Sequence, residues 1–526
     1  FSEFIHPSRR LRSLLCAHSL ALGHTTSSLL LLLPPPYGLI STRPPPRHHT
    51  LVYSTHPMGF LPPYLLTLLA GCCALLLLRL LLAGGASLVD PDAGLPAIDL
   101  IRRWGYPAEA YDVTTDDGYI LELQRIPRGR EADQWSDSLP RPAILLMHGL
   151  HGSALNWIMN LPEQSAAFIF ADAGYDVWLG NCRGNIYGQR HTHIDPASRA
   201  FWDFTWEDMA DHDVPAIVDF VLNITGQPSL HYVGHSQGFA IVTAHLASSG
   251  ERFAGKISEV FGVAPVWTNG YSWGPAVILS HKRPYYEFII KHFGSTQYHA
   301  KTTTFLSTMA KYMCVLPGVN YGCGILLEAF GGMPTLQINY TRTSVYLASI
   351  PAGSSTKNCV HWAQICHSKT NLRYDYGEAR NVEKYGQPTP PSFNLSRIHT
   401  PLHLFWSRED WLADDTDIRM FLDQVDPTII KSAEIIPGFN HFDFIFGTEA
   451  GDRVFKHILN RIAEGGTNHV DYVPRRDYRN PATEDQGYCT PDDYCTDTVA
   501  GSSDYGSEKA RFEASIFTNS SSLFCY

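Results

Sequence analysis

A serine flanked by glycines is the first residue whose setting suggests chemistry. It lies in HYVGHSQGFA, residues 231–240, between an apolar strand-like run and the helix-like run FAIVTAHLA. A strand, a very tight turn and a helix lift the hydroxyl of Ser236 out of the backbone, and glycines are needed where neighbouring chain crowds such a turn. Because G-x-S-x-G also occurs by chance, the other requirements of a nucleophilic serine have to be found elsewhere in the chain.

A nucleophilic serine requires two partners. Its hydroxyl is a poor nucleophile at neutral pH, so it needs a base within hydrogen-bond reach and a carboxylate that orients the base. In an α/β sheet with such a turn, the chain order is serine, acid and then histidine. Asp410 follows the strand-like run LHLFW, and His441 follows AEII in a loop before a helix. We therefore predict Ser236 as the nucleophile, Asp410 as the acid and His441 as the base.

Other acidic residues near Asp410 compete for the role of the acid. Glu409 is the alternative in the same loop. Asp414, Asp415 and Asp417 are expected to cap the helix TDIRMFLDQV instead, because carboxylate oxygens accept the N–H groups of a first helical turn.

Backbone donors for an oxyanion form the third requirement. The N–H group after the nucleophile, that of Gln237, supplies one donor, and a loop after an earlier strand supplies the second. The apolar run ILLM ends in His148-Gly149-Leu150. We predict Leu150 as the second donor, the alternative being that this segment is a plain strand-to-loop turn.

The elements that position these residues alternate along the chain. The continuous apolar runs AILLM, YDVWL and LHYV are typical of buried parallel strands, and helical patterns separate them. A hairpin is expected around Asp117-Gly118. From about 266 to 395, aromatic residues, Pro, Gly and Met interrupt this alternation, and strand patterns then resume. The sequence predicts a doubly wound, mostly parallel α/β sheet with a mainly helical cap inserted between the Ser and Asp strands.

The two ends of the chain differ from its middle. We expect a non-globular extension over 1–57, a signal peptide over 58–86, a core over 87–265 and 396–466, the cap over 266–395, and a flexible acidic tail over 467–526. The signal rests on the apolar run Leu65–Ala83 before small residues, although Arg79 interrupts it and an uncleaved signal anchor is the alternative. A targeting role is the alternative for the extension.

Composition and cysteine spacing limit which classes of function and which cellular compartments are expected. The 526 residues have a formal net charge of −11 without a basic block, which argues against nucleic acid. The sequence contains neither a C-x-x-C nor an H-E-x-x-H motif, so we expect no metal site. Cys314 and Cys323 bracket a turn and can close a small loop, whereas Cys182 is expected to be a buried free thiol. A helix over Cys359 and Cys366 would hold these two about 10 Å apart, too far for a disulfide.

The candidate glycosylation sites are Asn223, Asn339 and Asn394, with Asn519 in the tail.

Four long motifs carry a resemblance to a known family. HGLHGSALNWIMNLPEQSAAFIFADAGYDVWLGNCRGN, FWDFTWEDMADHDVPAIVDFVLNITGQPSLHYVGHSQG, EDWLADDTD and NHFDF resemble the acid lipase family of gastric and lysosomal lipases. The resemblance extends from about Pro96 to Glu464. It implies an α/β-hydrolase with a cap, which cleaves acylglycerols or sterol esters at a lipid–water interface without a cofactor, in the lysosome or outside the cell.

The same resemblance assigns roles residue by residue. Ser236, Asp410 and His441 become the catalytic residues, Leu150 and Gln237 the oxyanion donors, and Cys314–Cys323 a short-loop disulfide. The free cysteine of the family's cap is replaced by Gly331, and the cap is the most divergent part of the chain. The competing functions are a carboxylesterase or thioesterase acting on soluble esters, and an inactive lipid-binding protein. No obligatory protein partner is implied.

Overall fold

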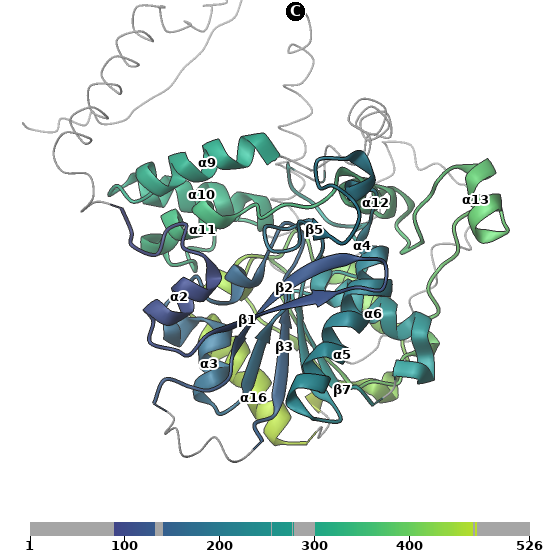
Figure 1. Ribbon diagram of the computed structural model, residues 1–526, viewed down its shortest axis with the longest axis horizontal. Coiled ribbons are helices and arrows are strands. Elements are labelled where there is room, and N and C mark those ends of the chain that lie inside the picture. The colour runs from purple at the N-terminus through teal and green to yellow at the C-terminus, as the bar shows by residue number, and fades with distance from the viewer. Residues whose placement is uncertain are drawn as a thin grey trace, which may run out of the picture. The chain divides into compact units, whose positions relative to one another are not determined.

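A mostly parallel sheet of ten strands forms the centre of the fold (Figure 1). The computed structural model describes residues 89–131, 140–253, 255–275, 277, 300–465 and 469–470, all within one compact unit that spans 79–526. The strand order is β1-β2-β4-β3-β6-β7-β8-β9-β10, with β5 beside β2. Pairing is antiparallel where β2 meets β1, β4 and β5, and parallel elsewhere. The predicted α/β-hydrolase architecture is confirmed.

The bounds of the elements follow chain order. The strands are β1 (Glu109–Thr114), β2 (Tyr119–Ile126), β3 (Ala143–Met147), β4 (Asp176–Leu179), β5 (Arg190–His191), β6 (Leu230–His235), β7 (Ile257–Val263), β8 (Leu402–Trp406), β9 (Ile430–Ile435) and β10 (His469–Val470). The core helices are α2 (Ala97–Arg103), α3 (Ala166–Asp172), α4 (Trp206–Asp208), α5 (Val214–Thr225), α6 (Gln237–Ser249), α14 (Asp415–Leu422), α15 (Asp443–Phe446) and α16 (Lys456–Ala463). The cap helices are α9 (Ala300–Met313), α10 (Val319–Gly331), α11 (Thr343–Ser349), α12 (Thr356–Ser368) and α13 (Glu378–Tyr385). Two π-helical turns are Met209–Asp213 and Gly451–Phe455.

Burial explains why the central strands are continuously apolar. Every residue of β3, β4 and β8 is buried, because helices cover both faces of the sheet. The edge strand β1 instead alternates between exposed positions and positions that are partly or fully buried, up to the predicted hairpin. Gly118 in that turn has a φ of 101°, a backbone conformation that favours glycine.

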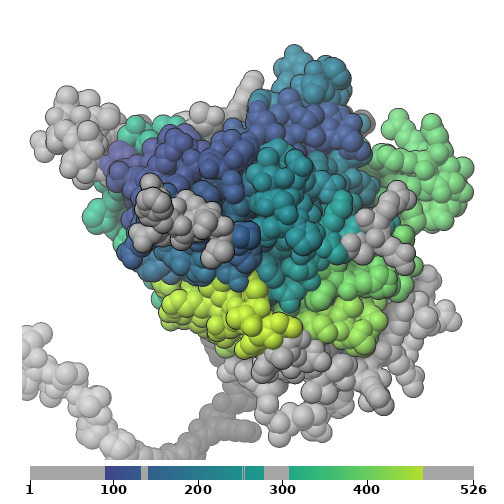
Figure 2. Space-filling view, turned by 60° about the horizontal axis from the view of Figure 1, so that its bottom comes forward, coloured from purple at the N-terminus to yellow at the C-terminus, as the bar shows by residue number. Residues whose placement is uncertain are grey.

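The helices lie in two layers around the sheet. Figure 1 shows α3 and α16 on one side and α5 and α6 on the other. Residues far apart in the sequence meet in the first layer, where the rings of Phe170 and Phe455 are 6.1 Å apart. Figure 2 shows the yellow C-terminal segment directly against the blue first half of the chain. This layering is the doubly wound arrangement that the alternating pattern predicts.

The inserted cap lies between β7 and β8, and its described part is mainly helical. Its helices α9, α10 and α12 lie beyond one end of the strands in Figure 1. The domain boundaries at 265 and 395 remain predictions. The extension 1–57 and the signal segment 58–86 lie outside the described residues, as does the tail except for β10, which pairs with β9. Within the described ranges, no helix is long and apolar enough to cross a membrane.

Candidate active site

Ser236 lies at the tip of a strained turn between β6 and α6. Its φ of 54° and ψ of −120° are unusual for a residue with a side chain and cost on the order of 1–3 kcal/mol. The Ser236 N–H donates to the carbonyl of Val263 at 3.1 Å, and its own carbonyl accepts the N–H of Phe239 at 3.0 Å. The neighbouring strand and the following helix therefore hold the turn in this conformation.

The two glycines of G-x-S-x-G are required by close backbone contacts. A Cβ at Gly234 would lie 2.7 Å from the backbone of Gly238, and a Cβ at Gly238 would lie 2.5 Å from the carbonyl oxygen of Met147. Backbone atoms cannot move aside as a flexible side chain can. The turn therefore has room for glycine alone at both positions, as its sequence indicates.

Asp410 and His441 form a buried hydrogen bond. The Nδ1 atom of His441 lies 2.8 Å from Oδ2 of Asp410, and the two residues are 3% and 2% exposed. The other carboxylate oxygen, Oδ1, accepts the N–H groups of Leu412 and Ala413, each at 2.8 Å. With the proton held at Nδ1, Nε2 of His441 carries the lone pair that a general base needs.

The competing acids near Asp410 have other partners. Glu409 accepts the hydroxyl of Ser407 at 2.5 Å and the N–H of Gly438 at 3.2 Å. Asp414 caps α14 by accepting the N–H of Thr416 at 2.8 Å. These two carboxylates are thus engaged in local turns, and in this group Asp410 is the one bonded to His441.

The expectation that Asp417 caps the same helix is wrong. Its buried carboxylate accepts the hydroxyl of Thr268 at 2.7 Å and the N–H groups of Gly270 and Tyr271 at 3.1 and 2.9 Å. Burial raises the pKa of Asp417 to about 6. The side chain fixes the start of the cap segment to the core, a contact across about 150 residues that local sequence patterns cannot reveal.

His235 brings the serine turn and the base loop together. Its ring lies 4.8 Å from the ring of His441, and its Nε2 lies 3.2 Å from the backbone carbonyl of His441. Burial, and then the charge of His441, lower the pKa of His235 well below its usual range. His235 is therefore a neutral donor that links the Ser236 turn to the His441 loop.

The predicted oxyanion loop passes directly beside the serine. A Cβ at Gly149 would lie 2.9 Å from Cβ of Ser236, so the segment that precedes Leu150 contacts Ser236. His148 orders this loop: its Nδ1 lies 2.8 Å from the carbonyl of Gly149, and its Nε2 accepts the N–H of Cys182 at 3.1 Å. Burial lowers the pKa of His148 to about 4, which keeps the ring neutral.

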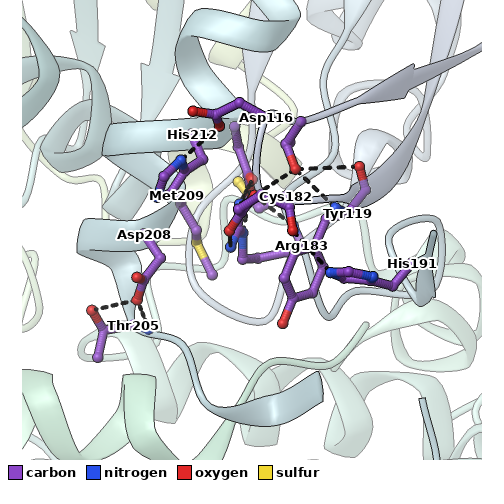
Figure 3. A network of polar contacts seen from close by, with 12 residues as sticks. Asp116, Tyr119, Cys182, Arg183, His191, Thr205, Asp208, Met209 and His212 are labelled. Atoms are coloured by element: carbon purple, nitrogen blue, oxygen red, sulfur yellow. Dashed lines mark hydrogen bonds and ion pairs between the residues drawn. The ribbon is translucent and has the colours of Figure 1, made fainter. Parts of the chain in front are cut away.

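A buried ion network braces the loop after β4, which holds His148. The guanidinium of Arg183 pairs with Asp213 at 2.7 Å and Asp117 at 2.6 Å, and lies 4.1 Å from the ring centre of Tyr119. Figure 3 shows Arg183 beside Tyr119 and next to Cys182. The network joins the hairpin turn, the loop after β4 and the π-helical turn Met209–Asp213. It therefore stabilises the loop after β4, which in turn contacts His148.

The side chain of Gln237 has a role that the sequence does not indicate. Its Oε1 accepts Nε1–H of Trp362 at 2.7 Å and Nδ2–H of Asn358 at 3.0 Å, both on cap helix α12. Its backbone N–H opens α6, where the prediction places an oxyanion donor. One residue thus joins the Ser236 turn to the cap.

The cysteines are arranged as expected. Cys314 and Cys323 form a disulfide with Cα atoms 5.9 Å apart. Cys182 is a buried free thiol, and Cys359 and Cys366 both lie on the single helix α12.

The candidate glycosylation sites differ in exposure. Asn223 and Asn394 are exposed, whereas Asn339 is half-buried and its Nδ2 donates to Gln164 at 3.2 Å. Glycosylation of these residues remains a prediction.

One group among the described residues has the spacing of a cation site. Asp116, Asp117 and His212 present ligand atoms within 4.8 Å of one another. Asp117 is already paired with Arg183, and His212 lies 2.7 Å from Asp116. These ion pairs make the three residues part of the Arg183 network.

Comparisons with known proteins match these observations. A family described as "alpha/beta hydrolase fold" matches residues 142–448, and one described as "Partial alpha/beta-hydrolase lipase region" matches 97–161. The chain is 38% identical to Lipase lipl-1 of Caenorhabditis elegans over 376 residues, 71% of this chain and 92% of that protein. It is also 38% identical to gastric triacylglycerol lipase of Bos taurus over 381 residues, 71% and 93% of the two chains. A putative lysosomal acid lipase/cholesteryl ester hydrolase of Crotalus adamanteus is 38% identical over 375 residues, 71% and 92% of the two chains.

Proposed function

This chain belongs to the α/β-hydrolase lipase family, and we propose that it hydrolyses ester bonds of neutral lipids through an acyl-enzyme formed on Ser236. Membership makes it a carboxylic ester hydrolase. Beyond family membership, we propose which residues are catalytic and which class of ester is the substrate. The observation that carries it is the buried bond between Asp410 and His441, placed beside the strained serine turn by the contact of His235.

The proposed reaction begins at the serine hydroxyl. Oγ of Ser236 attacks the ester carbonyl carbon while Nε2 of His441 takes the hydroxyl proton. The negative charge moves onto the former carbonyl oxygen, where the N–H groups of Leu150 and Gln237 stabilise it. Asp410 holds Nδ1–H of His441 and stabilises the imidazolium that forms.

The intermediate then breaks down in two stages. The C–O bond to the alcohol breaks, and His441 gives its proton to the leaving alkoxide, which leaves an acyl group on Ser236. Water, deprotonated by His441, attacks this acyl-enzyme, and a second tetrahedral intermediate releases the fatty acid and restores the serine hydroxyl.

A lipid substrate is supported by exposed apolar side chains of the cap. Leu326 and Phe330 on α10 are 61% and 47% exposed, and Met333 and Leu336 in the following loop are 45% and 57% exposed. Leu326 and Phe330 are four residues apart and therefore lie on the same side of α10, and neighbouring exposed apolar side chains mark a surface that meets another apolar phase. We infer contact with a lipid–water interface, where neutral lipids collect.

The substrate class and the compartment rest on the relatives and the disulfide. The relatives include proteins named for triacylglycerol and for cholesteryl ester hydrolysis, so we propose both lipid classes as substrates. A disulfide between Cys314 and Cys323 favours an oxidising compartment. We therefore propose that the protein is secreted or lysosomal.

One comparison of rates tests the proposal. Purified protein and its Ser236→Ala variant are assayed on trioleoylglycerol emulsion, cholesteryl oleate and a short soluble ester, at acid and neutral pH. We expect the emulsified lipids to be hydrolysed faster once an interface forms, and Ser236→Ala to be inactive on all three. Turnover of the soluble ester alone, without interfacial activation, would support the esterase function instead.

A further inference from the structure

Two glycines at the end of cap helix α10 lie between the acid loop and the base loop. The carbonyl of Gly331, the last residue of α10, accepts the N–H of Trp411 at 3.0 Å and the N–H of His441 at 3.3 Å. Trp411 directly follows Asp410 in the chain. A single cap carbonyl therefore bonds both to the base and to the residue after the acid.

The second glycine extends this contact. Gly332 forms an antiparallel bridge with Asp410. A Cβ at Gly332 would lie 2.6 Å from the backbone carbonyl oxygen of Glu409 and 2.6 Å from Cβ of Asn440. These atoms belong to the residues just before the acid and just before the base. No side chain fits here unless one of the two loops moves.

Gly331 is crowded as well, but by softer neighbours. A Cβ there would lie 2.7 Å from the ring of Phe442 and 3.0 Å from Cβ of His441. The aromatic ring of Phe442 can shift by a few tenths of an ångström to make room for a methyl group, whereas the backbone atoms around Gly332 cannot. The two positions thus differ in how strongly a methyl group would displace the base loop.

We propose that Gly332 is a positioning residue which, together with the backbone carbonyl of Gly331, keeps Asp410 and His441 at bonding distance, so that the end of a cap helix sets the geometry of the acid–base pair. This inference rests on the proposed function. The acid and base loops follow different strands, β8 and β9, and the glycine pair gives them a common contact outside the sheet. Misplacing a reacting group by about 1 Å can lower a rate by roughly 10²-fold.

The same helix supplies two matched controls. At Gly322 of α10, a Cβ would meet no atom within 4 Å, so Gly322→Ala adds a methyl group without a clash. At Gly324, a Cβ would lie 2.4 Å from the ring of Tyr340 and 3.1 Å from Thr343, both within the cap. Gly324→Ala therefore disturbs the packing of α10 away from the acid and base loops.

The test measures kcat and KM separately on a short soluble ester, together with the melting temperature. We expect Gly332→Ala to lower kcat by roughly 10²-fold with KM nearly unchanged, and Gly331→Ala to lower it less. Gly322→Ala should match wild type. Gly324→Ala should lower the melting temperature while the folded enzyme keeps its kcat. This split between kcat and stability is what a purely structural role of the glycine pair would not produce.

Three results would overturn the inference: a folded Gly332→Ala with wild-type kcat, an equal loss of kcat in Gly324→Ala, or failure of both Gly331→Ala and Gly332→Ala to fold. Ser236→Ala in the same assay keeps the two proposals apart. Full activity of Ser236→Ala would refute the proposed function. Inactive Ser236→Ala beside an unchanged Gly332→Ala would refute the positioning role alone.

Discussion

Replacing Asp410 by Asn is the sharpest test of the acid–base pair, because the structure fixes which way the new amide must turn. Oδ1 of Asp410 accepts two backbone N–H groups, from Leu412 and Ala413. Only the carbonyl oxygen of an asparagine can satisfy these donors. Its NH2 group must then face Nδ1 of His441, where Oδ2 now lies.

An NH2 group in that place forces the wrong tautomer on the base. Nδ1 of His441 has to become the acceptor, so the proton moves to Nε2, the atom that should take the serine proton. Triad acids changed to amides in this way lose roughly 10⁴ in turnover. That factor corresponds to about 5 kcal/mol in the activation free energy.

The assay is turnover of the soluble ester and of the lipid emulsion by purified Asp410→Asn. Nuclear magnetic resonance of the histidine nitrogens would show the change of tautomer at His441. Asp414→Asn and Glu409→Gln are the matched controls. Asp414→Asn should keep its turnover and lose less than about 1 kcal/mol of stability, because the asparagine oxygen still caps α14 and only the interaction of the charge with the helix N-terminus is lost.

Two results would refute this reasoning. Wild-type turnover in Asp410→Asn would show that the bond between Asp410 and His441 is not needed. A collapse in Glu409→Gln or Asp414→Asn would move the role of the acid to that residue and leave the serine and histidine assignments intact.

The remaining predictions concern the cap, pH and the lipid surface. Gln237→Leu should lower the free energy of unfolding by about 2–4 kcal/mol in chemical denaturation, because two buried donors on α12 lose their acceptor; an unchanged midpoint would contradict this. Burial raises the pKa of Asp443 to about 7, so the folded state binds an extra proton between about pH 4 and 7. The melting temperature of wild type should therefore fall relative to that of Asp443→Asn as pH rises through this range, and parallel curves would exclude the effect. Leu326→Ser with Phe330→Ser should slow hydrolysis of the emulsion several-fold and spare the soluble ester, whereas Val382→Ser, equally exposed on α13, should change neither.

Local patterns in the sequence were sufficient to predict the elements that carry the candidate site. The turn at Ser236, the hairpin at Gly118 and the buried strands each depend on neighbours within about ten residues, so composition and spacing indicate them. Strand β7 was missed, because ISEVFGV mixes polar and apolar residues and lies next to the irregular cap segment. Its place in the sheet comes from pairing with β6 and β8, which only the assembled sheet reveals.

Contacts between the cap and the core could not be predicted from the sequence. The bonds from Gln237 to α12 and from Asp417 to Thr268 join residues more than 100 positions apart. A glutamine after a serine and an aspartate in a first helical turn each have an ordinary local explanation. Only the folded chain shows that both side chains bind the insertion.

These contacts place different constraints on different parts of the cap. Gln237 ties α12 to the nucleophile turn, Asp417 holds the segment that leads into the cap, and the carbonyl of Gly331 meets the acid and base loops. Under the proposed mechanism, changes at Gln237 or at the Gly331 carbonyl act next to the reacting groups, whereas changes at Asp417 act through the cap segment. The side chains of Leu326 and Phe330 on α10 are exposed instead, and we expect substitutions there to change the surface that the cap presents to the lipid. Substrate preference can therefore diverge on the outside of the cap, while the anchors beneath keep one geometry for the chemistry.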